Sequence, residues 1–147
     1  MAKCFRQRKR GRMEETEEIE SKKDKLQYFF DSYAIIEILN ENPNYKNFLL
    51  FPITLALLNL AEIYWYCIND PKLESEANNV YEKFRKSVVE IEDETLKEAM
   101  KFRKEHKKKD ISYTDAIGYI YAKEHGMKFL TGDKAFEHME NVEYIKK

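Results

Sequence analysis

The chain has 147 residues, of which 43% are hydrophobic and 36% charged, and its formal net charge is −1. A chain of this length forms one domain around one core, and its apolar and aromatic content excludes an intrinsically disordered protein. With a net charge near zero, only a local basic patch can attract a polyanionic partner, which argues against non-specific coating of nucleic acid.

The N-terminal segment, residues 1–26, is charged and contains few apolar side chains. A basic run at residues 6–10 is followed by an acidic run at residues 14–20. No apolar stretch follows the basic run, so the segment lacks the pattern of a signal peptide. We therefore expect residues 1–26 to form a mobile extension and residues 27–147 to form the folded domain.

From residue 27 onward, short apolar segments alternate with segments of helical periodicity. The apolar segments predict five strands, Tyr28–Phe30, Phe51–Ile53, Val88–Ile91, Met127–Leu130 and Val142–Ile145. The helical segments are Ala34–Leu39, the apolar run after Thr54, Asp70 to about Ser87, Glu94–His106 and Ser112–His125. Thr54 and Asp70 are placed to cap the helices that follow them, and Gly126 to end the last helix.

Strands separated by helices predict an α/β fold with a central parallel sheet whose two faces are covered by helices. In such a sheet, the ligand crevice lies beyond the carboxyl ends of the strands. Side chains that directly follow the predicted strands are therefore the first candidates for a functional site.

The cysteines and the longest apolar run indicate the compartment. Cys4 and Cys67 are far apart and form no Cys-x-x-Cys pair, so neither a disulfide framework nor a zinc site is predicted. The run Ile53–Ile68 is interrupted by polar residues and is shorter than the ~20 residues that cross a bilayer. We expect a cytoplasmic protein without a membrane span, in which this run forms a buried helix.

Two acids follow predicted strands. Asp31 comes directly after the first strand, and Asp133 follows the fourth strand across a Thr-Gly turn. Each acid has a simpler interpretation as a helix N-cap, Asp31 for the helix after it and Asp133 for a short helix containing Ala135 and Phe136.

Two further acids lie on predicted helices. Glu62 has apolar neighbours on both sides, and a carboxylate is costly to bury without a partner. Alternatively, Glu62 and Asn59 mark a thin solvent-facing stripe of their helix. Asp115 is the third residue after Ser112, a spacing that is also typical of a capping box.

The joint placement of the four acids predicts one site. Two carboxylates ~5 Å apart repel each other by roughly 3 kcal/mol at an effective dielectric constant of ~20, so a cluster of four needs protons or cations. Mg²⁺ or Mn²⁺ suits carboxylate and water oxygens, and no His or Cys set recruits zinc. Ions of this kind activate water and stabilise the leaving oxygen in phosphodiester hydrolysis.

Four short segments resemble the PIN domain, the nuclease fold best known from the VapC toxins of prokaryotic toxin–antitoxin pairs. The segments are residues 28–32 (Tyr-Phe-Phe-Asp-Ser), 59–62 (Asn-Leu-Ala-Glu), 112–117 (Ser-Tyr-Thr-Asp-Ala-Ile) and 129–136 (Phe-Leu-Thr-Gly-Asp-Lys-Ala-Phe). The resemblance extends from Gln27 to the C-terminus and implies a PIN-like three-layer α/β/α fold. Tyr33, where a small residue is usual, and the charged extension depart from the family pattern.

The resemblance also implies roles for individual residues. Asp31, Glu62, Asp115 and Asp133 would be the catalytic metal-binding acids, and Ser32 and Thr131 would support metal-bound water. Similar proteins form homodimers, cut RNA and are held inactive by an antitoxin. The resemblance therefore implies an Mg²⁺- or Mn²⁺-dependent endoribonuclease with an RNA substrate, a cognate antitoxin and a homodimeric state.

An RNA substrate also requires cations near the acids. The candidates for phosphate contacts are Arg85, Lys86, Arg103, Lys104, Lys107, Lys108 and Lys109. For the run Lys107–Lys109, the alternative is a solvated helix end that complements the negative pole of the helix dipole.

Other functions remain to be weighed. A PIN-type fold can serve as a non-catalytic interaction module in an RNA-processing or regulatory assembly, although retention of all four acids argues against it. A phosphate-receiver domain would require paired acids after the first strand, but Ser32 follows Asp31. The sequence argues against a dinucleotide-binding enzyme, because the chain has four glycines and no Gly-x-Gly-x-x-Gly motif.

Overall fold

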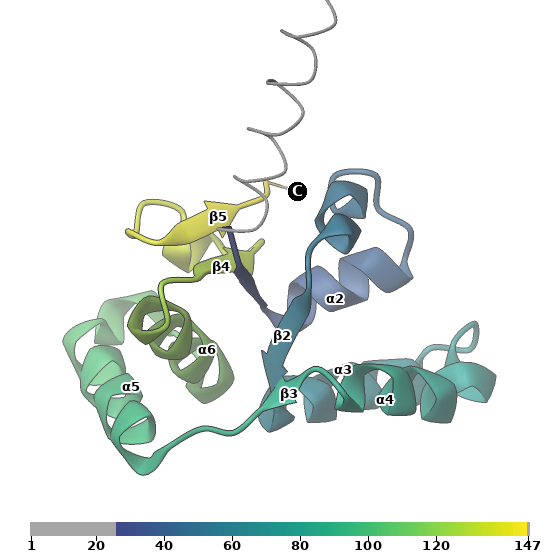
Figure 1. Cartoon of the computed structure of the whole chain (residues 1–147), viewed down its shortest axis with the longest axis horizontal. Coiled ribbons are helices and arrows are strands. Elements are labelled where there is room, and N and C mark those ends of the chain that lie inside the picture. Colours follow the sequence, from purple (N-terminus) through teal and green to yellow (C-terminus); the bar gives the residue numbers. More distant parts are fainter. Residues whose placement is uncertain (1–25, 147) are drawn as a thin grey trace, which may run out of the picture.

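The computed structural model describes residues 26–146 (Figure 1). The predicted mobile extension, residues 1–26, falls outside these residues except for Leu26, which packs against the core. Cys4 also lies outside, whereas Cys67 is a buried free thiol.

The centre of the fold is a five-stranded sheet in which every pairing is parallel, as predicted. Its strands are β1 (Tyr28–Phe30), β2 (Ile53–Ala56), β3 (Val88–Val89), β4 (Lys128–Thr131) and β5 (Val142–Tyr144). The spatial order is β3-β2-β1-β4-β5. The chain thus builds the sheet outward from β1 in one direction and then returns to its other side with β4. This reversal between β1 and β4 is the switch point at which such sheets open a ligand crevice.

Helices cover both faces of the sheet (Figure 1), which confirms the three-layer α/β/α architecture. The α-helices are α2 (Ser32–Leu39), α3 (Leu57–Asn69), α4 (Ala77–Arg85), α5 (Asp93–Glu105) and α6 (Tyr113–Glu124). Short 3₁₀ helices are η1 (Lys46–Leu50), η2 (Glu74–Glu76), η3 (Lys107–Lys109) and η4 (Lys134–Phe136). Phe30 and Leu130 face the core beneath α2, α3 and α4, whereas Phe29 and Phe129 face α5 and α6. The alternation follows from the two-residue period of a strand.

Two predicted helix starts are wrong. Thr54 caps no helix, because β2 continues to Ala56 through pairing with β3, and α3 begins at Leu57. The N–H of Ala56, just before α3, donates to the carboxamide oxygen of Asn59 at 3.0 Å. A free N–H group at the start of the helix thus gains a partner. Asp70 ends α3 instead of opening a helix; its carboxylate accepts the N–H of Lys72 at 2.8 Å in a local turn, and α4 starts later, after η2. Gly126 follows α6 with a φ of 66°, as predicted.

The prediction that Ile53–Ile68 forms a buried helix is also wrong. Part of the run is strand β2, and only one face of α3 is buried, because this helix lies in an outer layer. The opposite face exposes apolar side chains, Leu57 at 54%, Leu58 at 47%, Trp65 at 68% and Ile68 at 37%. Among residues 26–146, none of the helices combines the length and apolar character needed to cross a membrane.

Candidate active site

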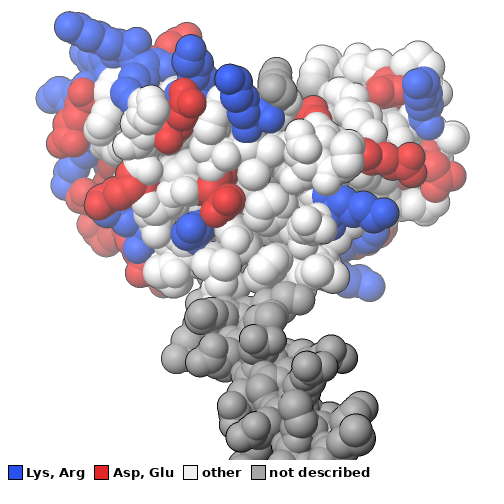
Figure 2. Space-filling view, turned by 90° about the horizontal axis from the view of Figure 1, so that it is seen from above, with Lys and Arg blue, Asp and Glu red and all other residues white. Residues whose placement is uncertain are grey.

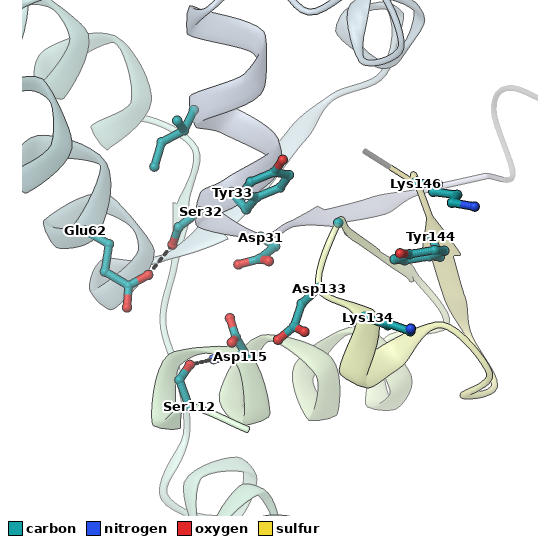
Figure 3. A pocket seen from close by; sticks show the side chains of 12 residues that line it. Asp31, Ser32, Tyr33, Glu62, Ser112, Asp115, Asp133, Lys134, Tyr144 and Lys146 are labelled. Atoms are coloured by element: carbon teal, nitrogen blue, oxygen red, sulfur yellow. Dashed lines mark hydrogen bonds between the residues drawn. The ribbon is translucent and has the colours of Figure 1, made fainter. Parts of the chain in front are cut away.

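All four predicted acids line one cleft of about 770 Å³ beyond the carboxyl ends of β1 and β4 (Figure 3). The cleft is lined by Asp31, Ser32, Tyr33, Ile36, Glu62, Ser112, Asp115, Gly132, Asp133, Lys134, Tyr144 and Lys146. Acids that are separated by up to 102 positions in the sequence are thus brought together by the sheet order and by two helices, α3 after β2 and α6 before β4.

Asp31 lies at the switch point, where its N–H extends the β1–β4 pairing by donating to the carbonyl of Leu130 at 3.0 Å. The residue occupies the N-cap position of α2, but its carboxylate makes no capping hydrogen bond. Instead, the Thr131 hydroxyl donates to Asp31 Oδ2 at 2.8 Å. Only 3% of Asp31 is exposed. The capping interpretation therefore fails, and Asp31 is a buried carboxylate fixed by Thr131.

The turn after β4 carries the second acid of this edge. Asp133 caps η4, since Oδ1 accepts the N–H of Ala135 at 2.9 Å, and the simpler interpretation is therefore correct as well. The Asp133 N–H in turn donates to the hydroxyl of Thr131 at 3.0 Å. Between them, a Cβ added to Gly132 would lie 2.4 Å from the ring of Tyr33. Gly132 thus provides the space for the bulky Tyr33 that departs from the family pattern.

Glu62 reaches the cleft from α3. The Ser32 hydroxyl donates to Glu62 Oε2 at 2.5 Å, and Asn59 Nδ2 donates to Ser32 Oγ at 3.0 Å. Glu62 is exposed, whereas Asn59 is fully buried, so the two do not form a solvent-facing stripe. Sequence reasoning missed that Asn59 orients Ser32, although its position inside an apolar run was the available signal.

Asp115 enters the cleft from the first turn of α6. The Ser112 Oγ accepts the N–H of Asp115 at 3.0 Å, which confirms the predicted N-cap. The side chain of Asp115 nevertheless points toward Asp31 and Asp133 (Figure 3). Asp115 therefore has two roles: its backbone N–H binds the N-cap residue of α6, and its carboxylate lines the cleft.

The carboxylates change each other's ionisation. Burial raises the pKa of Asp31 well above its usual range, and the negative charges of Asp115 and Glu62 raise it further, against the opposing effect of Thr131. Burial also raises the pKa of Asp115, while hydrogen bonds from Ser112 and Asp31 lower it. Burial and the neighbouring acids thus disfavour two negative charges at Asp31 and Asp115. The pair is stabilised by a proton or by a cation.

The donor chemistry of the cleft fits a hard divalent ion. Its lining offers carboxylate and hydroxyl oxygens, with neither His nor Cys. The negative charges of Asp115 and Glu62, which add to burial in raising the pKa of Asp31, would also attract a cation. Within residues 26–146, no three His, Cys, Asp or Glu side chains are arranged closely enough to hold an ion as they stand. The fit is therefore one of charge and ligand type, and a bound ion would have to draw the carboxylates closer together.

The sequence of residues 28–142 matches the PIN domain family. The chain belongs to the PIN domain family. Its fold is similar to solved toxin–antitoxin structures. A toxin–antitoxin complex from Klebsiella pneumoniae superposes with a TM-score of 0.65 and 17% identity over 82% of this chain and 99% of that one. VapBC2 from Rickettsia felis, solved with a DNA fragment from its promoter, superposes with a TM-score of 0.64 and 16% identity. The match covers 83% of this chain and 99% of that one.

FitAcB from Neisseria gonorrhoeae has the same fold, with a TM-score of 0.59 and 17% identity over 81% of this chain and 97% of that one. No curated protein matches the sequence. The VapC-like PIN fold inferred from four short segments is thus confirmed.

The cleft of this PIN domain also contains cations that sequence reasoning missed. Lys134 and Lys146 line it together with Tyr144, on the wall formed by the segments after β4 and β5 (Figure 3). All three lie at or just beyond a strand's carboxyl end, so the rule that identified Asp31 could have identified them. The seven cations predicted to contact RNA all lie in the described part of the chain, and none lines this cleft. Arg85 instead lines an apolar groove beside β3.

Proposed function

We propose that this PIN domain is an Mg²⁺- or Mn²⁺-dependent endoribonuclease that hydrolyses RNA phosphodiester bonds and acts as the toxin of a toxin–antitoxin pair. One observation carries the proposal: four carboxylates from distant segments, one of them almost fully buried, line a single open cleft. Buried carboxylates with raised pKa values destabilise a fold unless they bind something positive, which makes them typical of functional sites.

Hydroxyl groups hold two of the four proposed catalytic acids in place. Asp31, Glu62, Asp115 and Asp133 would hold the metal, which when bound lowers the pKa of water and stabilises the leaving oxygen. Thr131 fixes Asp31, and Ser32 orients Glu62, so neither carboxylate has to find its rotamer during the reaction. On the opposite wall, Lys134 and Lys146 would bind phosphate oxygens and offset the negative charge of the acids.

The experiment that tests the proposal is cleavage of a mixed RNA pool by the purified, antitoxin-free chain. We expect cleavage with Mg²⁺ or Mn²⁺, loss of cleavage in EDTA to the level of a no-protein control, and recovery when excess metal is restored. Cleavage that continues undiminished in EDTA would reject metal dependence. Matched DNA, tested in parallel, separates a ribonuclease from a general nuclease.

A non-catalytic interaction module is the second candidate. It is favoured by the absence, within residues 26–146, of any three acids close enough to hold an ion. This alternative predicts that the purified chain cleaves no RNA with either metal and yields a stable partner on pull-down. The same assay therefore decides between the two functions.

We propose two protein partners, a cognate antitoxin and a second copy of the chain. Solved structures with this fold include toxin–antitoxin complexes, which supports the first. The exposed apolar face of α3 supports an interface, because soluble monomers seldom leave such contiguous patches uncovered. An RNA substrate and the free thiol of Cys67 fit the reducing cytoplasm, which is the compartment we propose.

The dimer proposal predicts that Trp65→Glu dissociates the dimer into monomers. A buried charge without a partner destabilises an interface by several kcal/mol. Sedimentation should show a dimer for the native chain and a monomer for this variant. Leu50→Glu is the matched control, because Leu50 is equally exposed at 68% but lies on η1. A monomeric native chain, or equal dissociation by both variants, would contradict the proposal.

A further inference from the structure

A second, basic cavity lies beside the acidic cleft. It has a volume of about 300 Å³ and is lined by the end of α5, by η3 and by the segment that leads into α6. Its charged lining comprises Arg103, Lys104 and Lys107 against Asp110. Positive charge therefore prevails in a cavity that contains none of the proposed catalytic acids.

The two cavities are lined by neighbouring residues of the chain. Ile111 lines the basic cavity and Ser112 lines the acidic cleft, and the Cα atoms of consecutive residues are only about 3.8 Å apart. The basic segment is also fastened to the rim of the cleft, because Lys109 Nζ donates to the carbonyl of Ala135 at 3.0 Å. Ala135 follows Lys134, which lines the acidic cleft. The basic cavity therefore lies close to the rim of the acidic cleft.

Arg103 is held in place at this junction. Its Nε donates to the carbonyl of Ile111 at 2.6 Å, and its guanidinium carbon lies 4.0 Å from the ring centroid of Tyr113. A group that is already fixed loses little freedom when it binds a ligand. The terminal guanidinium nitrogens carry the paired donors that recognise phosphate. Tyr113, 60% exposed, adds an aromatic surface beside this cation, a combination that is common in single-strand nucleic-acid sites.

The wider charge distribution agrees with this arrangement. Figure 2 shows Lys and Arg side chains gathered at one corner of the end of the molecule that α5 and α6 occupy in Figure 1, with Asp and Glu side chains beside them. Because the whole chain has a net charge of −1, only a local patch of this kind can attract a polyanion.

We infer that the basic cavity binds a backbone phosphate of a single-stranded RNA whose scissile bond lies in the acidic cleft. This inference rests on the proposed function and deepens it, because it assigns the strand's path: along Tyr113 and Arg103 to Lys104 and Lys107. It also selects, from the cations predicted by sequence, those at the end of α5 and in η3.

The test measures RNA binding separately from cleavage. A labelled, single-stranded RNA is titrated with the Asp31→Asn chain, and with the same chain carrying Lys104→Gln and Lys107→Gln, at several salt concentrations. Both lysines are exposed, so the fold should persist. Loss of two phosphate contacts lowers the slope of log K against log salt by about 1.4 and weakens binding roughly tenfold at low salt. Lys46→Gln with Lys72→Gln is the matched control, since these lysines are exposed and line neither cavity.

The outcomes are distinct. A lower slope for Lys104→Gln/Lys107→Gln, with the control unchanged, supports the inference. Equal slopes for both pairs overturn it, even if the native chain cleaves RNA and the proposed function stands. If the native chain cleaves no RNA, the proposed function fails, and the same binding comparison still decides whether this cavity holds phosphate.

Discussion

Asparagine in place of Asp31 is expected to lower the rate of RNA cleavage by more than about 100-fold in Mg²⁺ or Mn²⁺. Asparagine has nearly the shape of aspartate and can still accept the hydroxyl hydrogen bond of Thr131. The change therefore removes the buried negative charge while it leaves the packing at the switch point in place. We expect the same loss for Asp115→Asn, because the two carboxylates interact with each other and would hold the same metal ion.

The control for this experiment is Asp93→Asn. Asp93 is an exposed aspartate at the start of α5 and does not line the cleft, so its neutralisation should leave the cleavage rate within about twofold of native. Circular dichroism of each variant should match the native spectrum. Native rates in both Asp31→Asn and Asp115→Asn would reject the proposed roles of these acids.

The second large effect is expected on the stability of the metal-free chain. Most substitutions in a core lower stability, but Asp31→Asn is expected to raise it. Burial and neighbouring charge raise the pKa of Asp31 well above its usual value of 3.8. The folded chain therefore binds protons more tightly than the unfolded chain. The contribution of Asp31 to stability is fully present below the pKa that this carboxyl has in the unfolded chain. That contribution is lost as the pH rises through the pKa of the folded chain. The pKa of Asp115 is raised as well, so its contribution has the same sign.

Asp31→Asn should consequently raise the Tm of the metal-free chain at neutral pH and flatten this part of the pH dependence. Thermal melts in EDTA at several pH values measure both effects, with Asp93→Asn again as the control. A divalent ion at about 100 times its Kd should stabilise the native chain by about 2.7 kcal/mol, and Asp31→Asn far less. A variant that melts below the native chain in EDTA at neutral pH would show that the Asp31 carboxylate is not destabilising.

Local rules were enough to predict that two of the candidate acids would lie in one cleft. Asp31 and Asp133 were found because parallel strands end at one edge of the sheet, and side chains after those ends share a crevice. The same rule applies to Lys134 and Lys146, which lie just beyond the ends of β4 and β5 and outside the basic runs of the sequence. Because Lys104 and Lys107 lie in such a run, they were identified, yet their separation from the acidic cleft could not be read from it.

The prediction of the fold failed mainly at boundaries and at faces. Thr54 has the chemistry of a helix cap, but β2 extends past it because β3 offers backbone partners for two more residues. That pairing comes from a segment more than thirty positions away and has no local signature. The apolar character of α3 predicted burial, although Leu57, Leu58 and Trp65 are exposed in the single chain. Composition reveals that a helix is apolar on several sides, but not what covers each side.

The sequence alone determined the order of strands and helices and the parallel sheet, and it predicted Asp31 and Asp133 at the edge of that sheet. Periodicity and strand-end position are local properties of the chain. Tertiary structure decided which partners fix those acids: Thr131 lies against Asp31, and Asn59 orients Ser32 toward Glu62. It also decided that a basic cavity adjoins the acidic cleft. These contacts join residues 27 to 100 positions apart, and only the packing of helices against the sheet brings such residues within hydrogen-bonding distance.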